Sequence, residues 1–278
     1  MSTHFLYRYY GKDEYLLDVV TNKRLYFCRP SEFNDPFDCR PLISFKHSNR
    51  TSKRTWHRLM YYLAAAQYPH LPQSDLIKHA DAALRRGLHR SRTWLSQADE
   101  ALKTVGALAR VCCFAKSPRN MMMWAHYAKN HSGAALQFRT SGLLDQRSGE
   151  FKGHDVVYTP SSVTVEEYVH ALERGFEHND PLEMASLMYT TKTSDWETEN
   201  EVRFFSSIET PYVSFEEPTL SGVILGDRCS EWLVRRILNS LGRWEKAPRV
   251  FRASIEKSSH RLWIQNNRTT QRVVPPDR

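Results

Sequence analysis

The sequence lacks the features of several large classes of protein. None of its apolar runs reaches the roughly 18 residues that a transmembrane helix needs. Its first residues have no basic stretch followed by an apolar one, so no secretory signal is expected. Its five cysteines are odd in number, irregularly spaced and free of any Cys-x-x-Cys pair, which argues against disulfides and zinc. We therefore expect a cytoplasmic protein with reduced thiols and no membrane contact.

Several catalytic signatures are also missing. The chain has no P-loop, no GxGxxG, no GxSxG and no HExxH motif. The sequence therefore does not predict a P-loop NTPase, a dinucleotide-binding Rossmann domain, an α/β-hydrolase or a zincin protease.

What the chain does contain is an ordinary globular composition with a basic bias. It has 278 residues, of which 41% are apolar and 25% charged, enough for one large domain. The formal net charge is +8, and basic residues cluster in segments 46–58 and 85–92. Such clusters favour nucleic acid or another anionic partner, whereas a solvated basic surface is the simpler explanation of the same charge.

Strand-like and helix-like segments follow one another without a strict βαβ order. Strands are predicted over 5–10, 24–28, 108–114, 133–138, 155–158, 201–206, 222–226 and 249–255. Helices are predicted over 14–20, 121–129, 165–176, 181–189 and 229–241, and three further helical sets lie within 52–107.

This pattern predicts an α+β fold with one curved or split, mixed or antiparallel sheet and flanking helices. We expect a single α+β domain over 1–265, a basic helical insertion at about 46–107, and a disordered basic tail over 266–278.

The most informative segment runs from Trp196 to Phe205. Glu199, Glu201 and Arg203 alternate there, so on an extended strand all three would point to one face. Two carboxylates and a guanidinium on one face either neutralise each other in solvent or line a polar cleft.

Arg8 is the second candidate, between Tyr7 and Tyr9 on the first predicted strand. A planar guanidinium can bind a pyrophosphate or carboxylate at two points. The alternative is an ion pair with Glu199 or Glu201 on an adjacent strand.

Polar residues in two loops complete one set of candidates. Asn34 and Asp35 precede a proline after a predicted strand, where they either bind a ligand or build the turn. Lys192 precedes the glutamate segment and could bind phosphate or pair with a glutamate.

His126 and Tyr127 lie on a predicted short helix, where an aromatic ring could stack on a base and His126 could act as acid or base. The structural alternative is a helix packed in the core with a hydrogen-bonded histidine. His126 and His131 are five residues apart, the wrong spacing for two ligands on one helix face, so no metal is expected.

Several separated motifs together resemble the DUF2971 family of uncharacterised bacterial proteins, which is often met near mobile elements and defence genes. The motifs are Leu6-Tyr7-Arg8-Tyr9, Leu25-Tyr26-Phe27, Phe33-Asn34-Asp35-Pro36-Phe37-Asp38, Cys113-Phe114, Met123 to Ala128, His131-Ser132-Gly133, Val157-Tyr158, Lys192, Trp196, Glu199, Glu201, Arg203 and Gly222 to Gly226. The resemblance covers nearly the whole chain apart from 46–107 and the tail. Family members often have serine after Cys-Phe, where this chain has Ala115.

A second resemblance concerns chemistry. An arginine on the first strand, a middle strand with an aromatic or hydroxyl residue and a later E-x-E strand are the layout of ADP-ribosyltransferases of the arginine–serine–glutamate type. Arg8, Cys113-Phe114 and Glu199-Asn200-Glu201 follow in this order. The resemblance implies an enzyme that acts on NAD⁺, in which Glu201 stabilises the ribosyl cation and Glu199 acts on the acceptor. The family context implies a toxin or phage-defence effector, with a partner or activator protein among its expected partners.

Two alternatives belong to other classes. The same polar residues could form a non-catalytic module that binds an anionic ligand or nucleic acid. Acidic pairs can also hold Mg²⁺, which keeps a metal-dependent nuclease open, although the lysine expected two residues after a carboxylate is missing.

Overall fold

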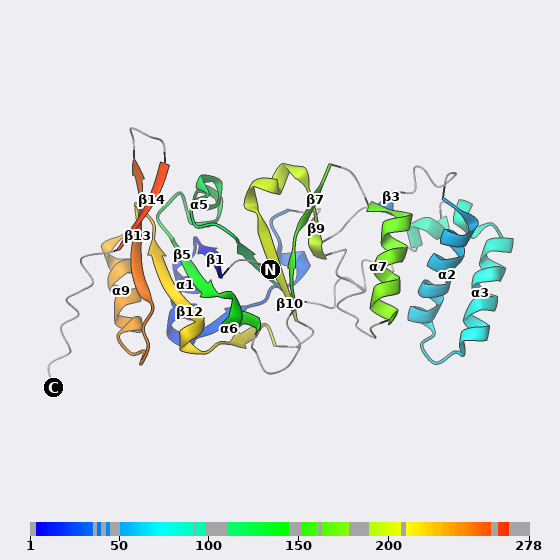
Figure 1. The fold of residues 1–278 in the computed structure, drawn as a ribbon, viewed down its shortest axis with the longest axis horizontal. Helices are drawn as coiled ribbons and strands as arrows, with labels where there is room; N and C mark the ends of the chain where they lie inside the picture. The colour runs from blue at the N-terminus through cyan, green and yellow to red at the C-terminus, as the bar shows by residue number, and fades with distance from the viewer. Residues whose placement is uncertain are drawn as a thin grey trace. The chain divides into compact units, whose positions relative to one another are not determined.

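The computed structural model divides the chain into two compact units. Its described residues are 4–35, 38–39, 43–44, 51–91, 93–97, 110–144, 152–160, 163–177, 189–206, 210–256 and 261–266. The first unit comprises residues 1–28, 111–155 and 196–278, and the second comprises 29–110 and 156–195. The basic helical segment 46–107 therefore falls in the second unit. Figure 1 labels the elements of both units, which are described separately below.

The first unit is built on an eight-stranded sheet in the order β14-β13-β12-β5-β1-β4-β10-β6. The strands are β1 (Phe5–Tyr10), β4 (Arg110–Ala115), β5 (Ala134–Arg139), β6 (Lys152–Asp155), β10 (Glu201–Ser206), β12 (Leu220–Leu225), β13 (Arg249–Glu256) and β14 (Arg261–Asn266). The β12–β13 pair is parallel, and β5 runs antiparallel to both β1 and β12. The predicted α+β class with a mixed sheet is confirmed.

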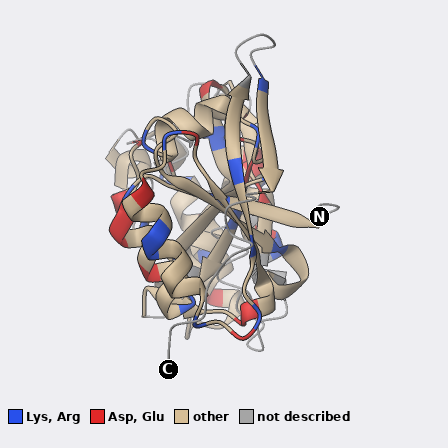
Figure 2. Ribbon diagram, turned by 90° about the vertical axis from the view of Figure 1, so that its left-hand side faces the viewer, with Lys and Arg blue, Asp and Glu red and all other residues tan. Residues whose placement is uncertain are grey.

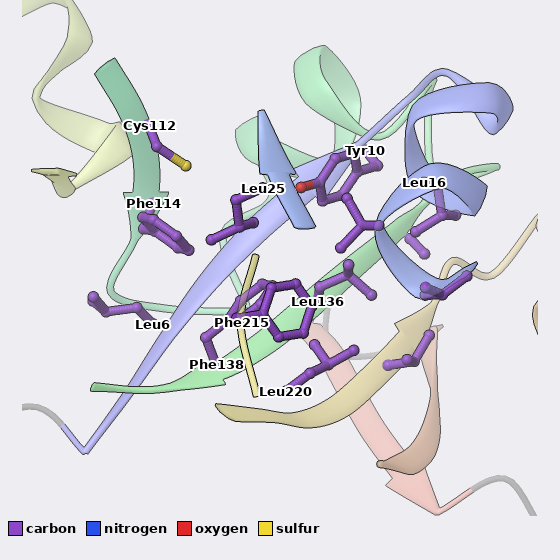
Figure 3. Packing of buried hydrophobic residues seen from close by; sticks show 14 of the residues in the cluster. Leu6, Tyr10, Leu16, Leu25, Cys112, Phe114, Leu136, Phe138, Phe215 and Leu220 are labelled. Carbon is purple, nitrogen blue, oxygen red and sulfur yellow. The ribbon is translucent and has the colours of Figure 1, made fainter. Parts of the chain in front are cut away.

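One face of this sheet, called the first face below, is covered by two amphipathic helices, α1 (Asp13–Asn22) and α9 (Glu231–Leu241). Ser230 caps α9 by accepting a hydrogen bond from the backbone N–H of Leu233. The neighbouring strands β1, β4 and β10 place even-numbered residues in the core on this face, because alternate side chains of a strand share a face. Figure 3 shows this core, where Phe114 packs edge-to-face against Phe138.

The opposite face, called the second face, is covered by the short helix α5 (Met121–Tyr127). Asn120 caps this helix, as its side-chain oxygen accepts from the backbone N–H groups of Met122 and Met123. Trp124 is fully buried against Tyr9 of β1, with ring centroids 5.3 Å apart. The helix thus fixes its last turn, including Tyr127, against the second face.

Two glycines allow close backbone contact where α5 leads into β5. A Cβ added at Gly226 would lie 2.1 Å from the backbone oxygen of His131, and one added at Gly133 would lie 2.0 Å from that of Tyr10. Lys129, Asn130 and His131 all have positive φ angles, a left-handed turn that non-glycine residues seldom adopt. The backbone is therefore locally strained where Gly226 and Gly133 approach this turn, a place called the crossing below.

The remaining elements of the first unit are small. They are α6 (Thr140–Leu144), the 3₁₀ turn η4 (Glu217–Thr219) and the paired strands β2 (Arg24–Tyr26) and β11 (Tyr212–Ser214). On the outer side of α9, exposed Arg235 pairs with Glu231 at 3.3 Å, and Figure 2 shows both charge signs on this helix.

The second unit is mainly helical. Its helices and 3₁₀ turns are η1 (Pro30–Glu32), α2 (Lys53–Gln67), α3 (Gln73–Arg85), η2 (Leu88–Arg90) and α7 (Val165–Glu177), with short strands β3 (Ile43–Ser44), β7 (Val157–Thr159), β8 (Val163–Thr164) and β9 (Thr191–Thr193). Trp56 and Leu59 of α2 pack with Tyr168 and Val169 of α7, and α2 and α3 lie side by side (Figure 1).

Some predicted elements fall outside the described residues. They are most of the predicted helix 181–189, the part of the third helical set beyond residue 97, and the predicted tail beyond Asn266, which itself ends β14. Within the described part of the chain, no helix combines the length and the apolar character needed to cross a membrane.

Candidate functional site

The predicted glutamate segment centres on a buried ion pair. Every residue of β10 is buried, and its even-numbered residues Val202 and Phe204 join the first-face core. Glu201 and Arg203 therefore point to the second face. The Nη2 atom of Arg203, whose side chain is 0% exposed, donates to Oε2 of Glu201 at 2.8 Å. Such a charge-assisted bond holds the carboxylate in one orientation.

Glu199 is not on the strand, so the prediction that three alternating side chains share one strand face is wrong in this detail. Glu199 ends the 3₁₀ turn η3 (Ser194–Glu199), and Asn200 follows with a φ of 46° before β10 begins. Asparagine tolerates this left-handed conformation better than most residues do. Glu199 is buried and accepts a 2.6 Å hydrogen bond from the hydroxyl of Tyr127 on α5. Both carboxylates thus belong to the second-face side of the sheet.

Cys113 of β4 is a neighbour of Glu201 that the sequence did not assign to the site. Burial raises the pKa of the Cys113 thiol well above its usual value, and the nearby Glu201 carboxylate, which accepts a bond from it, raises it further. The thiol is therefore protonated at neutral pH and can donate to Glu201. Only the register of β4 against β10 brings these residues together, and one chain's alternation does not reveal such a register.

The three strands singled out by their motifs are consecutive in the sheet, in the order β1, β4, β10. Tyr7 of β1 lies opposite Ala115 of β4. Ala115, like Tyr9, belongs to the second-face cluster, and Tyr7 packs against that cluster. Ala115, the position compared with serine in the sequence analysis, is thus on the same face as Glu201 and carries only a methyl group.

Arg8 takes the other face. It alternates with Tyr7 and Tyr9, and its Nη1 donates to the sulfur of Cys112, which belongs to the first-face core. Arg8 and Glu201 therefore point to opposite faces of the sheet. The expected meeting of these two residues in one cleft, either as an ion pair or around a ligand, does not occur in this arrangement.

The two tyrosines beside Arg8 are on the second face and already have partners. The hydroxyl of Tyr7 accepts a 3.3 Å hydrogen bond from Nε2 of Gln137. The hydroxyl of Tyr9 donates to the backbone oxygen of Ser117 at 2.8 Å, and its burial raises the pKa of this phenol. Tyr9 is thus buried with its hydroxyl bonded, whereas the side chain of Tyr7 is only partly buried.

His126 is exposed on α5, and its ring lies 6.5 Å from the ring of Tyr127. His131 is buried and stacks on Trp124 at 6.0 Å, so of the two histidines only His126 is open to solvent.

Asn34, Asp35 and Lys192 lie in the second unit. Asn34 is exposed and Asp35 is buried. Lys192 pairs with Asp38, with 3.2 Å between Nζ and Oδ2, and both side chains are 4% exposed. Asp38 ends the Asn-Asp-Pro-Phe-Asp motif and was not among the predicted ligands.

Metal ligands do not converge in the part of the chain that the structure describes. Among these residues, no group of three or more histidine, cysteine, aspartate or glutamate side chains could hold a metal ion.

Comparison of the chain with the curated proteins and with the solved structures found no match, whereas a family model does match part of it. The matching segment contains Tyr127, Lys192, Glu199, Glu201 and Arg203. Residues 123–204 match the family model described as "Protein of unknown function (DUF2971)", which confirms the resemblance predicted from the sequence over this segment.

Proposed function

We propose that the chain is a cytoplasmic ADP-ribosyltransferase-like enzyme that acts on NAD⁺ through the second-face residues around Glu201. One observation carries this proposal. The strands with the arginine motif, the Cys-Phe motif and the glutamate motif are neighbours in one sheet, although more than 80 residues separate them pairwise along the chain. The placement of Arg8 on the first face limits the catalytic group to the glutamates and their partners.

The chemistry assigned to these residues follows from charge. Breaking the bond between nicotinamide and ribose leaves positive charge on the ribosyl carbon, which a fixed carboxylate stabilises. Glu201 supplies that carboxylate, and Arg203 holds it in place. Glu199, hydrogen-bonded to Tyr127, receives a proton from the acceptor, which is water, a protein or a nucleic acid. A toxin or phage-defence effector fits such an activity.

The direct test is NAD⁺ consumption by the purified chain. Glu201→Asp keeps the negative charge beside Arg203 but withdraws the carboxylate by one methylene, so the rate should fall about 100-fold or more. Glu197→Asp is the matched control, since Glu197 is exposed in the same segment and should leave the rate unchanged. Equal rates for wild type and Glu201→Asp would remove this proposal.

Nucleic-acid binding is the second candidate function, and a specific observation in the second unit favours it. Five exposed basic residues have no acidic partner among the described residues, and they gather where α2 begins and α3 ends: Lys53, Arg54, Arg85, Arg86 and Arg90. The pKa of His89 is lowered by burial and then by the charges of Arg90 and Lys53, which places both cations near this ring. We call these five residues the basic end of the helical hairpin formed by α2 and α3.

Charge reversal at this end should weaken binding in a salt-dependent way. Arg86→Glu is expected to lower affinity for a short DNA or RNA duplex and to reduce the slope of log K against log salt by about 1. Lys78→Glu makes the same charge change within α3, which ends just before Arg86, but Lys78 already pairs with Asp75 at 2.8 Å, so its slope should match wild type. Fluorescence anisotropy over a salt series measures both, and identical slopes for the two variants would contradict a phosphate contact at Arg86.

A further inference from the structure

The sheet of the first unit forks between β1 and β4. These strands pair at a single position, Tyr7 with Ala115. Beyond it, β1 continues beside β5 as far as Tyr10, whereas Val111 of β4 pairs with Cys28 instead. Figure 3 shows Tyr10 and Cys112 on the diverging parts of the two strands. Arg8, one residue past the pair, lies at the point where the strands separate.

Arg8 places a positive charge in this fork, and no negative charge balances it there among the described residues. Its guanidinium donates to the Cys112 sulfur and lies 5.5 Å from the centre of the Tyr10 ring, and no carboxylate of the described residues pairs with it. Burial raises the pKa of Cys112 to about 12 despite the opposing effect of Arg8, so this thiol is neutral at pH 7 and does not balance the charge. A guanidinium has five N–H donors, most of which remain available here.

Tyr10 adds a second unused donor on the same face. Its side chain is 8% exposed, and its buried hydroxyl has no hydrogen-bond partner among the described residues. Burial raises the pKa of this phenol, so the hydroxyl keeps its proton. A buried hydroxyl without a partner is unfavourable because it has lost its hydrogen bonds to water, and a bound acceptor would restore one.

We infer that Arg8 and Tyr10 form a binding site for a small oxyanion, the phosphate or carboxylate group of a ligand, on the first face of the sheet. The anion accepts two N–H bonds from the Arg8 fork and one O–H bond from Tyr10. The anion balances the positive charge of Arg8, which the neutral Cys112 thiol leaves unbalanced. This site is separate from Glu201, which points to the other face, and it binds the anion without NAD⁺.

Isothermal titration calorimetry of the full chain tests the site without NAD⁺. Inorganic phosphate and malonate are titrated separately, with sodium chloride holding ionic strength constant. Saturable binding of either anion to wild type is expected, and the tighter of the two identifies the source of the oxyanion. Heat no greater than that of chloride for both anions would overturn the inference.

Three variants locate the binding. Tyr10→Phe removes only the unpartnered hydroxyl, so the protein should fold as wild type and bind the anion about tenfold more weakly. Arg8→Gln should abolish binding. Arg235→Gln is the control, because Arg235 is exposed on α9, already pairs with Glu231 at 3.3 Å, and should leave affinity unchanged. Wild-type affinity in Tyr10→Phe would overturn the site even if Arg8→Gln does not fold, and since no NAD⁺ is present, the result is independent of the proposed enzyme activity.

Discussion

Replacing Glu201 with glutamine is expected to lower the free energy of unfolding by about 3–5 kcal/mol. The physical reason is the burial of its partner. Arg203 is fully buried and keeps its charge at any working pH, so the variant leaves a buried cation without the carboxylate that faces it at 2.8 Å. Urea unfolding followed by circular dichroism measures the change.

Two further variants separate the ion pair from other effects. Glu197→Gln alters an exposed glutamate of the same segment and should change stability by less than about 0.5 kcal/mol. The double variant Glu201→Gln with Arg203→Met removes both charges, and it should lose less than the sum of the two single variants. Additive losses would show that the two side chains do not stabilise each other.

This expectation also changes how activity is tested. A loss of NAD⁺ consumption in Glu201→Gln could reflect unfolding alone, because the residue holds the core of the sheet as well as the proposed site. The aspartate variant keeps the charge and is the better probe of chemistry.

The second large effect is expected at Gly226, where alanine should cost about 3 kcal/mol or more. An added Cβ would lie 2.1 Å from the backbone oxygen of His131 and 2.8 Å from that of Gly133. Both atoms belong to backbone held by hydrogen bonds, since the Gly226 N–H donates to Gly133 and the Arg228 N–H donates to His131. Neither can move without breaking this crossing, so the clash is not relieved by a side-chain rotation.

Gly242 provides a matched control at the end of α9. It has a right-handed φ of −61°, and the nearest atoms to an added Cβ are 3.4 Å and 3.6 Å away, an ordinary contact distance. Gly242→Ala should therefore leave stability unchanged or raise it by about 0.4–1 kcal/mol. Thermal melts of both variants compare them directly, and equal melting temperatures would contradict the tight crossing at Gly226.

Much of the fold could be predicted from the sequence because its signals are local. The apolar runs of β1, β5, β10, β12 and β13 and the amphipathic pattern of α9 predict their elements within a few residues. The strand β14 was missed, because Arg261–Asn266 contains exposed polar residues at the edge of the sheet and has a weaker pattern.

The site was harder to predict because it depends on relations between strands. Alternation within β1 predicts that Arg8 points away from Tyr7 and Tyr9, but only the pairing of β1 with β4 and of β4 with β10 decides whether Arg8 shares a face with Glu201. The left-handed Asn200 broke the expected E-x-E alternation, and no feature of one sequence required it.

The single β1–β4 pair has a mechanical consequence. Among the described residues, the strands β14 to β1 and the strands β4 to β6 meet in one paired position of the sheet, and side chains make the other contacts between β1 and β4, such as Arg8 with Cys112 and Tyr9 with the backbone oxygen of Ser117. We expect such a boundary to act as a hinge, because small rotations about Tyr7 and Ala115 would leave both ladders intact. A ligand that bridges the two blocks would act as a clamp, slowing amide exchange along the facing edges far from its own contacts.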